Sequence, residues 1–214
     1  MYKNIFSFIG LLFVFSAGQG QEEWKLKSDK DGIKTYSRKL ADSKINTVKV
    51  ESVFPASVAQ FVSVILDVKS YDNWIYNSKS TRIIKQVSPD ELYYYSEVIF
   101  PWPTSNRDFV SHVVIRQDLR TQVVNVAANN VTGYAPERSN IVRITRSAAK
   151  WAITPLAGNQ VRIEYILQVD PGGDLPSWLI NPFASKGLIE TFKNLREQLK
   201  KPEYRFARLP FIID

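Results

Sequence analysis

The chain has 214 residues with 44% hydrophobic and 13% aromatic content, which is enough for one folded domain with its own core. It contains no cysteine, which excludes disulfides, a cysteine nucleophile and thiolate metal sites. The formal net charge of +7 favours anionic partners such as membrane surfaces, but the cations are scattered and form no nucleic-acid-binding motif, so nucleic acid is not an expected partner.

The first twenty residues have the pattern of a secretory signal peptide. Lys3 precedes an apolar run over residues 5–15, and small residues follow up to Gly20. An uncleaved membrane anchor is the alternative, but a run of about 11 residues is shorter than the ~20 that span a bilayer as a helix. We therefore expect residues 1–20 to be removed and the mature protein to be secreted or periplasmic.

The next part of the chain predicts a hairpin, a third strand and a helix. The strands are expected at residues 24–27, 33–38 and 46–54. The turn Asp29-Lys30-Asp31-Gly32 joins the first two. Ser57 is a suitable N-cap for a helix that ends at Leu66, because the apolar residues between them are spaced three and four apart.

The middle of the chain predicts six more strands. Apolar and polar residues alternate there, as in strands with one buried face. These strands are expected at residues 80–86, 92–100, 109–116, 122–128, 141–153 and 160–169. Strands in the middle with helices near both ends favour an α+β fold.

The last part of the chain predicts a turn and a long amphipathic helix. Residues 171–173, Pro-Gly-Gly, end the preceding strand. The helix has an apolar stripe with spacings of four, three and four: Leu188, Phe192, Leu195 and Leu199. Asn181-Pro182 and Gly187 disfavour helical geometry, so we expect weak points there. Residues 202–214 follow as a C-terminal tail.

Three motifs, in this order, resemble the START domain family of lipid-transfer domains. They are Pro101 to Val110, Ile141-Val142-Arg143 continuing to Trp151 and Pro155-Leu156, and Pro171 to Asn181. With matches from Trp24 onward, the resemblance covers roughly residues 24–200, so residues 21–201 are expected to form one START-like domain. The resemblance implies a helix-grip fold, in which a curved antiparallel β-sheet wraps around a long C-terminal α-helix and encloses a tunnel for one lipid molecule.

The resemblance also implies which residues line that tunnel. Those expected on its inner face are Val113, Trp151, Tyr165, Leu167, Trp178, Phe183, Leu188 and Phe192. In the phosphatidylcholine and sterol carriers of the family, an arginine stands six positions after the motif arginine, whereas this chain has Val113 six positions after Arg107. A tunnel without that cation is expected to prefer a neutral or weakly polar ligand over a zwitterionic phospholipid.

Two charged residues are candidates for a buried pair in the tunnel. Glu97 shares a strand face with Tyr95, and Arg143 shares one with Trp151. Because a buried carboxylate needs a partner or a proton, an inward Glu97 predicts an ion pair with Arg143. The alternative is that one or both side chains point to solvent.

The Pro101-Trp102-Pro103 loop is expected at the tunnel rim, by the same resemblance. Its two prolines remove backbone donors and stiffen it. Trp102 either meets a membrane interface, a position that suits an amphipathic indole, or packs against the closing helix. The first alternative predicts transient contact with a membrane surface.

No catalytic arrangement stands out in the sequence. His112 is the only histidine and lies among valines on a predicted strand, which favours a structural role over that of a general base. Nucleophile and base pairs, phosphate-binding glycine loops, metal-ligand clusters and cofactor motifs are not apparent. The sequence predicts a non-enzymatic carrier or sensor of one lipid or other hydrophobic molecule. The alternatives are an enzyme on the same architecture, of the polyketide cyclase or aromatase kind, and a scaffold with a filled core.

Overall fold

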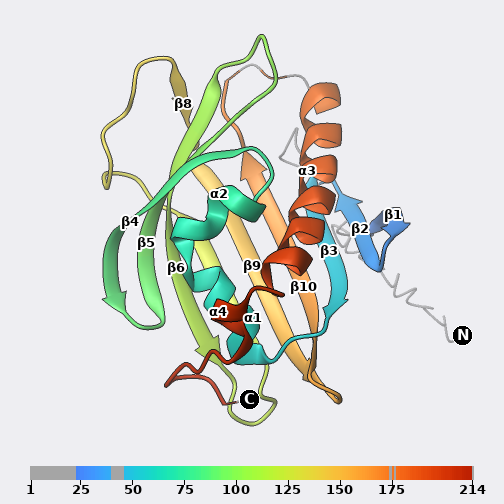
Figure 1. Ribbon diagram of the computed structural model, residues 1–214. Helices are drawn as coiled ribbons and strands as arrows, with labels where there is room; N and C mark the ends of the chain where they lie inside the picture. The colour runs from blue at the N-terminus through green and yellow to red at the C-terminus, as the bar shows by residue number, and fades with distance from the viewer. Residues whose placement is uncertain (1–22, 40–45, 174, 176, 214) are drawn as a thin grey trace, which may run out of the picture.

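The structure is a computed structural model that describes residues 23–39, 46–173, 175 and 177–213, except for the side chains of residues 177–179 and 181–184. The predicted signal peptide, residues 1–20, lies outside the described residues. The described chain forms a large curved sheet with helices on one side of it (Figure 1).

Ten strands form this sheet within the described residues. Their bounds are β1 Lys25–Lys30, β2 Ile33–Arg38, β3 Thr47–Phe54, β4 Ser78–Ser88, β5 Glu91–Val98, β6 Asn106–Gln117, β7 Val124–Asn130, β8 Ile141–Arg143, β9 Arg146–Leu156 and β10 Gln160–Asp170. The order is β1-β2-β3-β10-β9-β7-β6-β5-β4, with antiparallel neighbours throughout, and β8 pairs with β6 off this path.

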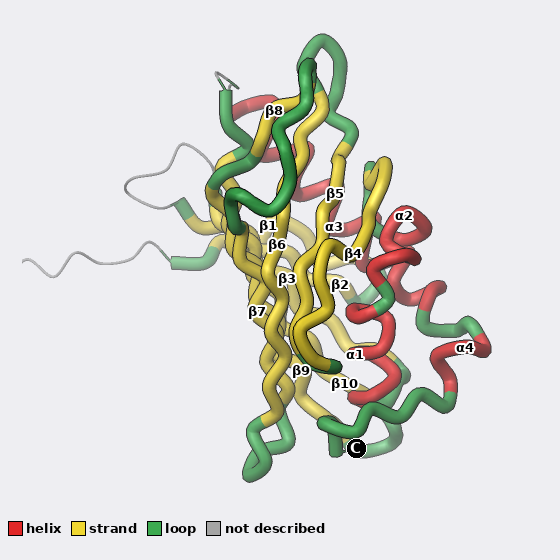
Figure 2. Tube along the Cα trace, turned by 90° about the vertical axis from the view of Figure 1, so that its left-hand side faces the viewer, coloured by secondary structure: helices red, strands yellow, loops and turns green. Residues whose placement is uncertain are grey.

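The helices lie on the concave side of the sheet. Their bounds are α1 Val58–Leu66, the 3-10 helix η1 Val68–Ser70, α2 Tyr71–Trp74, α3 Ser177–Gln198 and α4 Pro202–Arg205. Figure 2 shows α1, α2 and α4 together on one side of the strands. The predicted cap of α1 is confirmed, because the Ser57 hydroxyl accepts a hydrogen bond from the backbone N–H of Gln60 at 3.2 Å.

The long helix α3 packs its predicted apolar stripe against the sheet. Leu188, Phe192, Leu195 and Leu199 are all buried in the main core. A stripe spaced in this way covers one face of a helix, and its burial is the main source of helix stability in a folded protein. The predicted α+β helix-grip fold is confirmed.

The first hairpin is confirmed with a tighter turn than predicted. Strand β1 continues to Lys30, so that only Asp31 and Gly32 remain in the turn. Both have left-handed backbone angles, with φ of 55° and 70°. Two such residues in succession match the right-handed twist of the flanking strands, which favours Asp-Gly at this place.

The prediction of one strand over residues 141–153 is wrong. Residues 141–143 form β8, which runs parallel to residues 106–108 of β6, and β9 begins only at Arg146. Between them, the backbone N–H of Ile144 donates to the carbonyl of Asp108 at 2.8 Å. Alternation of apolar and polar residues continues through both strands, and it does not reveal that the chain changes its pairing partner between them.

Gly187 has a packing role in the middle of α3. A Cβ atom at this position would lie 3.0 Å from Cδ1 of Tyr76, so glycine lets α3 approach Tyr76 without displacing its ring. One turn further along, Thr191 accepts a hydrogen bond from the backbone N–H of Tyr76 at 3.0 Å. Gly187 therefore has a close packing contact, and the predicted weak point there stays a prediction.

The C-terminal segment packs onto the domain. Tyr204 of α4 is buried, and its hydroxyl donates to Asp67 at 2.7 Å and accepts from Gln198 at 2.8 Å. The backbone N–H of Ile213 donates to Gln117 of β6 at 2.8 Å. Residues 202–213 thus extend the folded unit beyond the predicted boundary at residue 201.

Candidate functional site

The concave face of the sheet is the face that α1 and α3 cover. Phe61 of α1 and Phe192 of α3 both approach Phe54 of β3, with ring centroids 5.4 and 6.0 Å away. The strand registers continue this face from β3 through β10, β9 and β7 to β6 and β5. In β3, β7, β9 and β10 all its side chains are uncharged: Val48, Val50, Ser52, Phe54, Val124, Val126, Ala128, Asn130, Ser147, Ala149, Trp151, Ile153, Pro155, Val161, Ile163, Tyr165, Leu167 and Val169.

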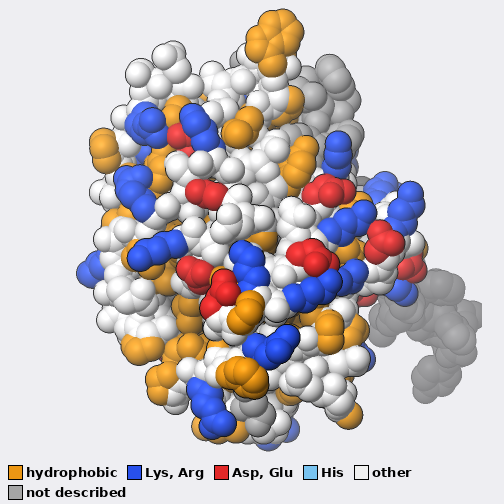
Figure 3. Space-filling model, viewed as in Figure 1, with side chains coloured by type: hydrophobic (Ala, Val, Ile, Leu, Met, Phe, Trp, Pro, Cys, Tyr) orange, Lys and Arg blue, Asp and Glu red, His pale blue; other side chains and the backbone are white. Residues whose placement is uncertain are grey.

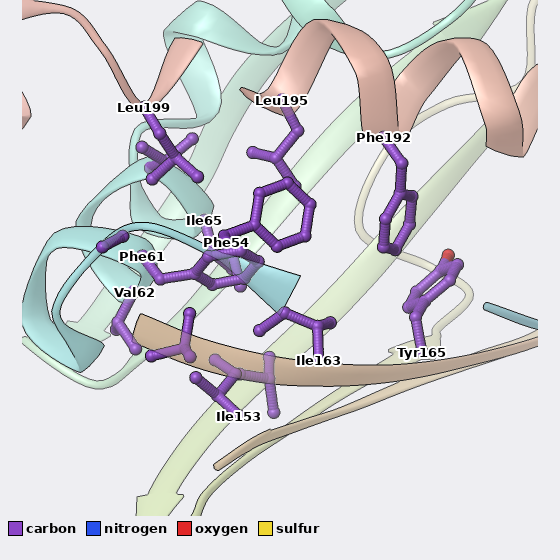
Figure 4. Packing of buried hydrophobic residues seen from close by; sticks show 14 of the residues in the cluster. Phe54, Phe61, Val62, Ile65, Ile153, Ile163, Tyr165, Phe192, Leu195 and Leu199 are labelled. Atoms are coloured by element: carbon purple, nitrogen blue, oxygen red, sulfur yellow. The ribbon is translucent and has the colours of Figure 1, made fainter. Parts of the chain in front are cut away.

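An aromatic cluster fills one part of this face. Its members are Phe54, Phe61, Trp151, Tyr165 and Phe192, and Figure 4 shows Phe192 of α3 directed toward Tyr165 of β10. The ring of Trp151 lies 4.2 Å from that of Tyr165 and stacks on Phe192 at 5.6 Å. Phe54, Phe61 and Phe192 are fully buried. Rings packed at these distances leave little room for a ligand.

The same face carries small side chains further along the strands. We call Ser111, Val113, Ala128, Ser147 and Ala149 the small-residue band. Val113 lies opposite Ala128, and Ala128 lies opposite Ala149. Ala128 and Ala149 are only half-buried although they face the side that the helices cover. Side-chain volume on the concave face therefore falls from the aromatic cluster to the small-residue band.

Two tyrosines border the small-residue band and stay neutral at physiological pH. Burial raises the pKa of Tyr94 to about 12, although a hydrogen bond with Ser111 acts in the opposite direction. Burial also raises the pKa of Tyr165, with a smaller contribution from Tyr94. The hydroxyls that these two tyrosines offer are therefore uncharged.

Most of the predicted lining residues come together on the concave side. They are Val113, Trp151, Tyr165, Leu167, Leu188 and Phe192. Trp178 and Phe183 belong to the first half of α3, where their side chains lie outside the described residues, so their role stays a prediction.

The predicted ion pair between Glu97 and Arg143 is wrong. Glu97 and Tyr95 project from the convex face of β5, opposite to the face of Leu92 and Tyr94 that continues to Val113. Glu97 instead accepts from Lys79 at 2.8 Å, Arg138 at 2.8 Å and Asn106 at 2.9 Å. Burial alone would raise the pKa of Glu97, but these hydrogen bonds and positive charges outweigh it and lower the pKa.

Arg143 pairs on the convex face with Asp108, which the sequence analysis did not single out. Its Nε and a terminal nitrogen donate to the two carboxylate oxygens at 2.7 and 3.1 Å. Arg143 also donates to the carbonyls of Ala135 and Pro136, so it holds the loop between β7 and β8 against the sheet. The hydrogen bond to Asp108 raises the pKa of Arg143. Tyr95, Glu97 and Arg143 thus anchor a covering loop and do not join the other predicted lining residues.

Arg107 links the β5–β6 loop to the turn before α3, a role that the sequence did not predict. It is buried, and it donates to the carbonyls of Ser105 in the β5–β6 loop and of Pro171 and Gly172 in the turn before α3. Burial lowers the pKa of this guanidinium. A Cβ atom on Gly172, whose φ is 68°, would lie 3.3 Å from Val142, so the turn needs glycine for both its backbone conformation and its contact.

Trp102 lies at the tip of the β5–β6 loop and is 91% exposed. Of the two alternatives for this side chain, packing against the closing helix is therefore excluded. Figure 3 shows a hydrophobic side chain protruding at the place where Figure 1 has this loop. An exposed indole on a proline-stiffened loop suits contact with a membrane interface.

His112 has a structural environment on the convex face. Its ring stacks on Tyr93 at 4.3 Å, and its Nε2 lies 2.8 Å from Glu91. Within the described ranges, no group of His, Asp and Glu is placed to hold a metal ion. The helices described here also include none with the length and apolar composition needed to cross a membrane.

Comparison with known proteins agrees with this arrangement. The START domain family model matches residues 12–205. An uncharacterized protein of Pseudomonas aeruginosa is 31% identical over 84% of this chain and 88% of its own length. Mouse phosphatidylcholine transfer protein is 29% identical over 81% of this chain and 82% of its own length.

A solved structure gives the same answer for the fold. The STAR-related lipid transfer protein of Xanthomonas axonopodis superposes with a TM-score of 0.78 and 30% sequence identity, over 84% of this chain and all of that one. The chain belongs to the START domain family.

Proposed function

We propose that this protein binds one neutral hydrophobic molecule, a lipid or a molecule of similar polarity, between the small-residue band and α3, and that it carries or senses this molecule. The observation that supports the proposal most strongly is the concave face of β3, β7, β9 and β10, which carries no charged side chain and whose side chains become small next to a packed aromatic cluster. Membership of a family of lipid-transfer domains supports the same function.

A carrier of this kind needs an apolar interior for energetic reasons. Moving an alkyl chain from a bilayer into water costs ~0.8 kcal/mol for each CH₂ group, so a sixteen-carbon chain costs on the order of 12 kcal/mol. A protein recovers this free energy only by burying the chain against apolar side chains. Val113, Ala128, Ala149 and Leu167 offer such a surface.

The position of Val113 supports a preference for a neutral ligand. It lies on the concave face between Leu92 and Ala128, and burial leaves it 3% exposed. Phosphate groups in proteins are held by charge-assisted hydrogen bonds, most effectively from arginine. A valine at this place supplies none, so the proposed ligand has no phosphate at the centre of the sheet.

Binding without chemistry is the proposed role of this interior. General acid–base catalysis needs a titratable side chain within reach of the bound molecule. In β3, β7, β9 and β10 the helix-facing side chains include no Asp, Glu, His, Lys or Arg. This composition supports carriage over a cyclase-like activity.

Export is a separate part of the proposal. The motif of residues 1–20 supports removal of a signal peptide and a secreted or periplasmic location. N-terminal sequencing of the protein from fractionated cells tests this. A mature N-terminus near Gln21 outside the cytoplasm is expected, and an intact Met1 in the cytoplasm would contradict it.

Ligand preference can be tested with two adjacent substitutions. Val113→Arg places a cation on the concave face, and Val114→Arg places it one residue along on the convex face. We expect the wild type and Val114→Arg to extract neutral lipids in preference to phosphatidylcholine from mixed vesicles, and Val113→Arg to shift uptake toward phosphatidylcholine. The readout is native mass spectrometry followed by organic extraction. Tight uptake of phosphatidylcholine by the wild type, unchanged in Val113→Arg, would contradict the proposal.

A further inference from the structure

A groove lies at the C-terminal end of α3, away from the β5–β6 loop. It is a groove of about 450 Å³ lined by Phe54, Pro55, Gln60, Asn159, Arg196, Leu199, Lys200, Arg205 and Phe206. We call it the basic groove, because three of these residues are cations and none is an acid. Figure 3 shows Lys and Arg side chains in the lower middle of the molecule, where Figure 1 places the end of α3 and α4.

The positive charge of the basic groove is only partly neutralised. Lys200 pairs with Glu197, with its Nζ 2.7 and 2.8 Å from the two carboxylate oxygens. Arg196 lies over the ring of Phe54, 5.7 Å from its centroid, and neither Arg196 nor Arg205 has a carboxylate partner among the residues that the structure describes. The groove therefore keeps positive charge that an anionic ligand would compensate.

An exposed aromatic ring stands beside these cations. Phe206 is 84% exposed, and it follows Arg205 directly. The segment that carries both residues is fixed, because Tyr204 is buried and hydrogen-bonded to Asp67 and Gln198. A fixed, exposed phenylalanine next to cations suits insertion at a membrane surface, where cations meet headgroups and the ring enters the interface.

The dipole of α3 explains only part of this arrangement. Cations near a helix C-terminus are stabilised by the last carbonyl groups, which accounts for Arg196 and Lys200. It does not account for Arg205 and Phe206, which belong to a different element, or for the hollow between the elements.

We propose that the basic groove binds the phosphate headgroup of an anionic phospholipid, with Phe206 in the interface, so that the α4 end is a membrane-docking site. The 22 residues of α3 place this end about 33 Å from the start of the helix, where the Trp102 loop lies. The basic groove and the small-residue band have no residue in common, so docking and ligand binding can be tested with separate substitutions.

The test uses vesicle co-sedimentation with the full mature chain. Vesicles contain phosphatidylcholine alone or phosphatidylcholine with 30% phosphatidylglycerol. The groove variant is Arg196→Gln/Lys200→Gln/Arg205→Gln, and its matched control is Lys25→Gln/Lys85→Gln/Lys150→Gln, which removes the same charge from exposed lysines on three strands. Each basic residue near an anionic surface contributes ~5-fold to binding, so we expect the groove variant to bind phosphatidylglycerol vesicles about 100-fold more weakly. The control should stay within about 5-fold of the wild type, because its lysines lie away from the docking surface.

Two further measurements distinguish a phospholipid headgroup from a soluble phosphate ester as the ligand of the basic groove. Phe206→Ser should weaken vesicle binding and leave the thermal melt and ligand occupancy unchanged, because the ring is exposed. Glycerol phosphate at millimolar concentration should not release the protein from vesicles. Equal losses in the groove variant and its control, or none in the groove variant, would overturn the proposal. Release by glycerol phosphate with no effect of Phe206→Ser would assign the groove to a soluble phosphate ester and overturn membrane docking.

Discussion

The two faces of the sheet differ in the charged side chains that they carry. The convex face buries the carboxylates of Glu97 and Asp108 and pairs them with cations. In β3, β7, β9 and β10 the concave face has no charged side chain. Buried charges need partners within hydrogen-bond distance, and the fold pairs these two carboxylates beside the β7–β8 loop, on the face turned away from α3. The buried cation Arg107 donates to backbone carbonyls at the start of α3, and the concave face of β3, β7, β9 and β10 offers no charged group to a ligand.

Removing an aromatic ring from the concave face should have the largest effect on stability. Phe192→Ala leaves a cavity between Phe54, Trp151 and Tyr165, so we expect a loss of about 3–5 kcal/mol in the free energy of unfolding. Chemical denaturation measures it. Lys186→Ala, at an exposed position in the same helix, is the control and should stay within about 0.5 kcal/mol. A loss below about 1 kcal/mol for Phe192→Ala would show that the aromatic cluster is loosely packed.

Breaking the best-buried ion pair of the convex face should cost nearly as much. Asp108→Ala removes both carboxylate acceptors of Arg143, whose side chain is only 8% exposed, and leaves its charge without a counter-charge. We expect a loss of about 3–5 kcal/mol by denaturation. Arg146→Ala breaks a pair with Asp170 that is largely exposed and should cost about 0–1 kcal/mol. Similar small losses for both variants would contradict the structural role of Asp108.

A smaller and pH-dependent effect is expected at Glu97. Its pKa in the folded state is lowered below the ordinary value of 4.5, so its pairing stabilises the fold above about that pH and is lost as the pH falls through the folded-state value. Glu97→Gln should therefore cost about 1–2 kcal/mol at pH 7, because Lys79 and Arg138 are half exposed and screened by solvent.

Thermal melts of Glu97→Gln and the wild type should be compared at a series of pH values. The difference between Glu97→Gln and the wild type should shrink below about pH 4.5, where protonation weakens the same contacts in the wild type. A difference that stays constant from pH 7 to pH 3.5 would mean that shape alone, and not charge, accounts for the loss.

Local patterns predicted the elements, because their signals lie close together in the sequence. The Ser57 cap, the Leu188 to Leu199 stripe and the alternation in β10 each depend on neighbours a few residues away. Combined with the family resemblance, these signals placed Val113, Tyr165 and Phe192 together on the concave side, where the structure has them.

The error at Glu97 has a physical cause in β5. Both faces of this strand are buried, one by the core and one by the loop between β7 and β8, so Tyr93, Tyr94 and Tyr95 show no alternation that would identify the inner face. Its partner Arg138 lies in that loop, where no periodic pattern exists. Asp108, the partner of Arg143, is next to Arg107 in one of the family motifs. Its pairing with Arg143 could not be predicted without knowing that β8 lies beside β6 in parallel register.

Filling the small-residue band tests the central claim most directly. Ala149→Phe adds a ring on the concave face, and Ala148→Phe adds it one residue away on the convex face. After incubation with host lipid extract, native mass spectrometry should show one bound molecule on the wild type and on Ala148→Phe, and none on Ala149→Phe. The melting temperature of Ala149→Phe should stay close to that of the wild type, because the ring occupies space that the ligand otherwise takes. Two results would contradict the account. One is full ligand occupancy in Ala149→Phe, and the other is a loss of about 1–3 kcal/mol in its free energy of unfolding, as overpacking causes, when it is compared with ligand-free wild type.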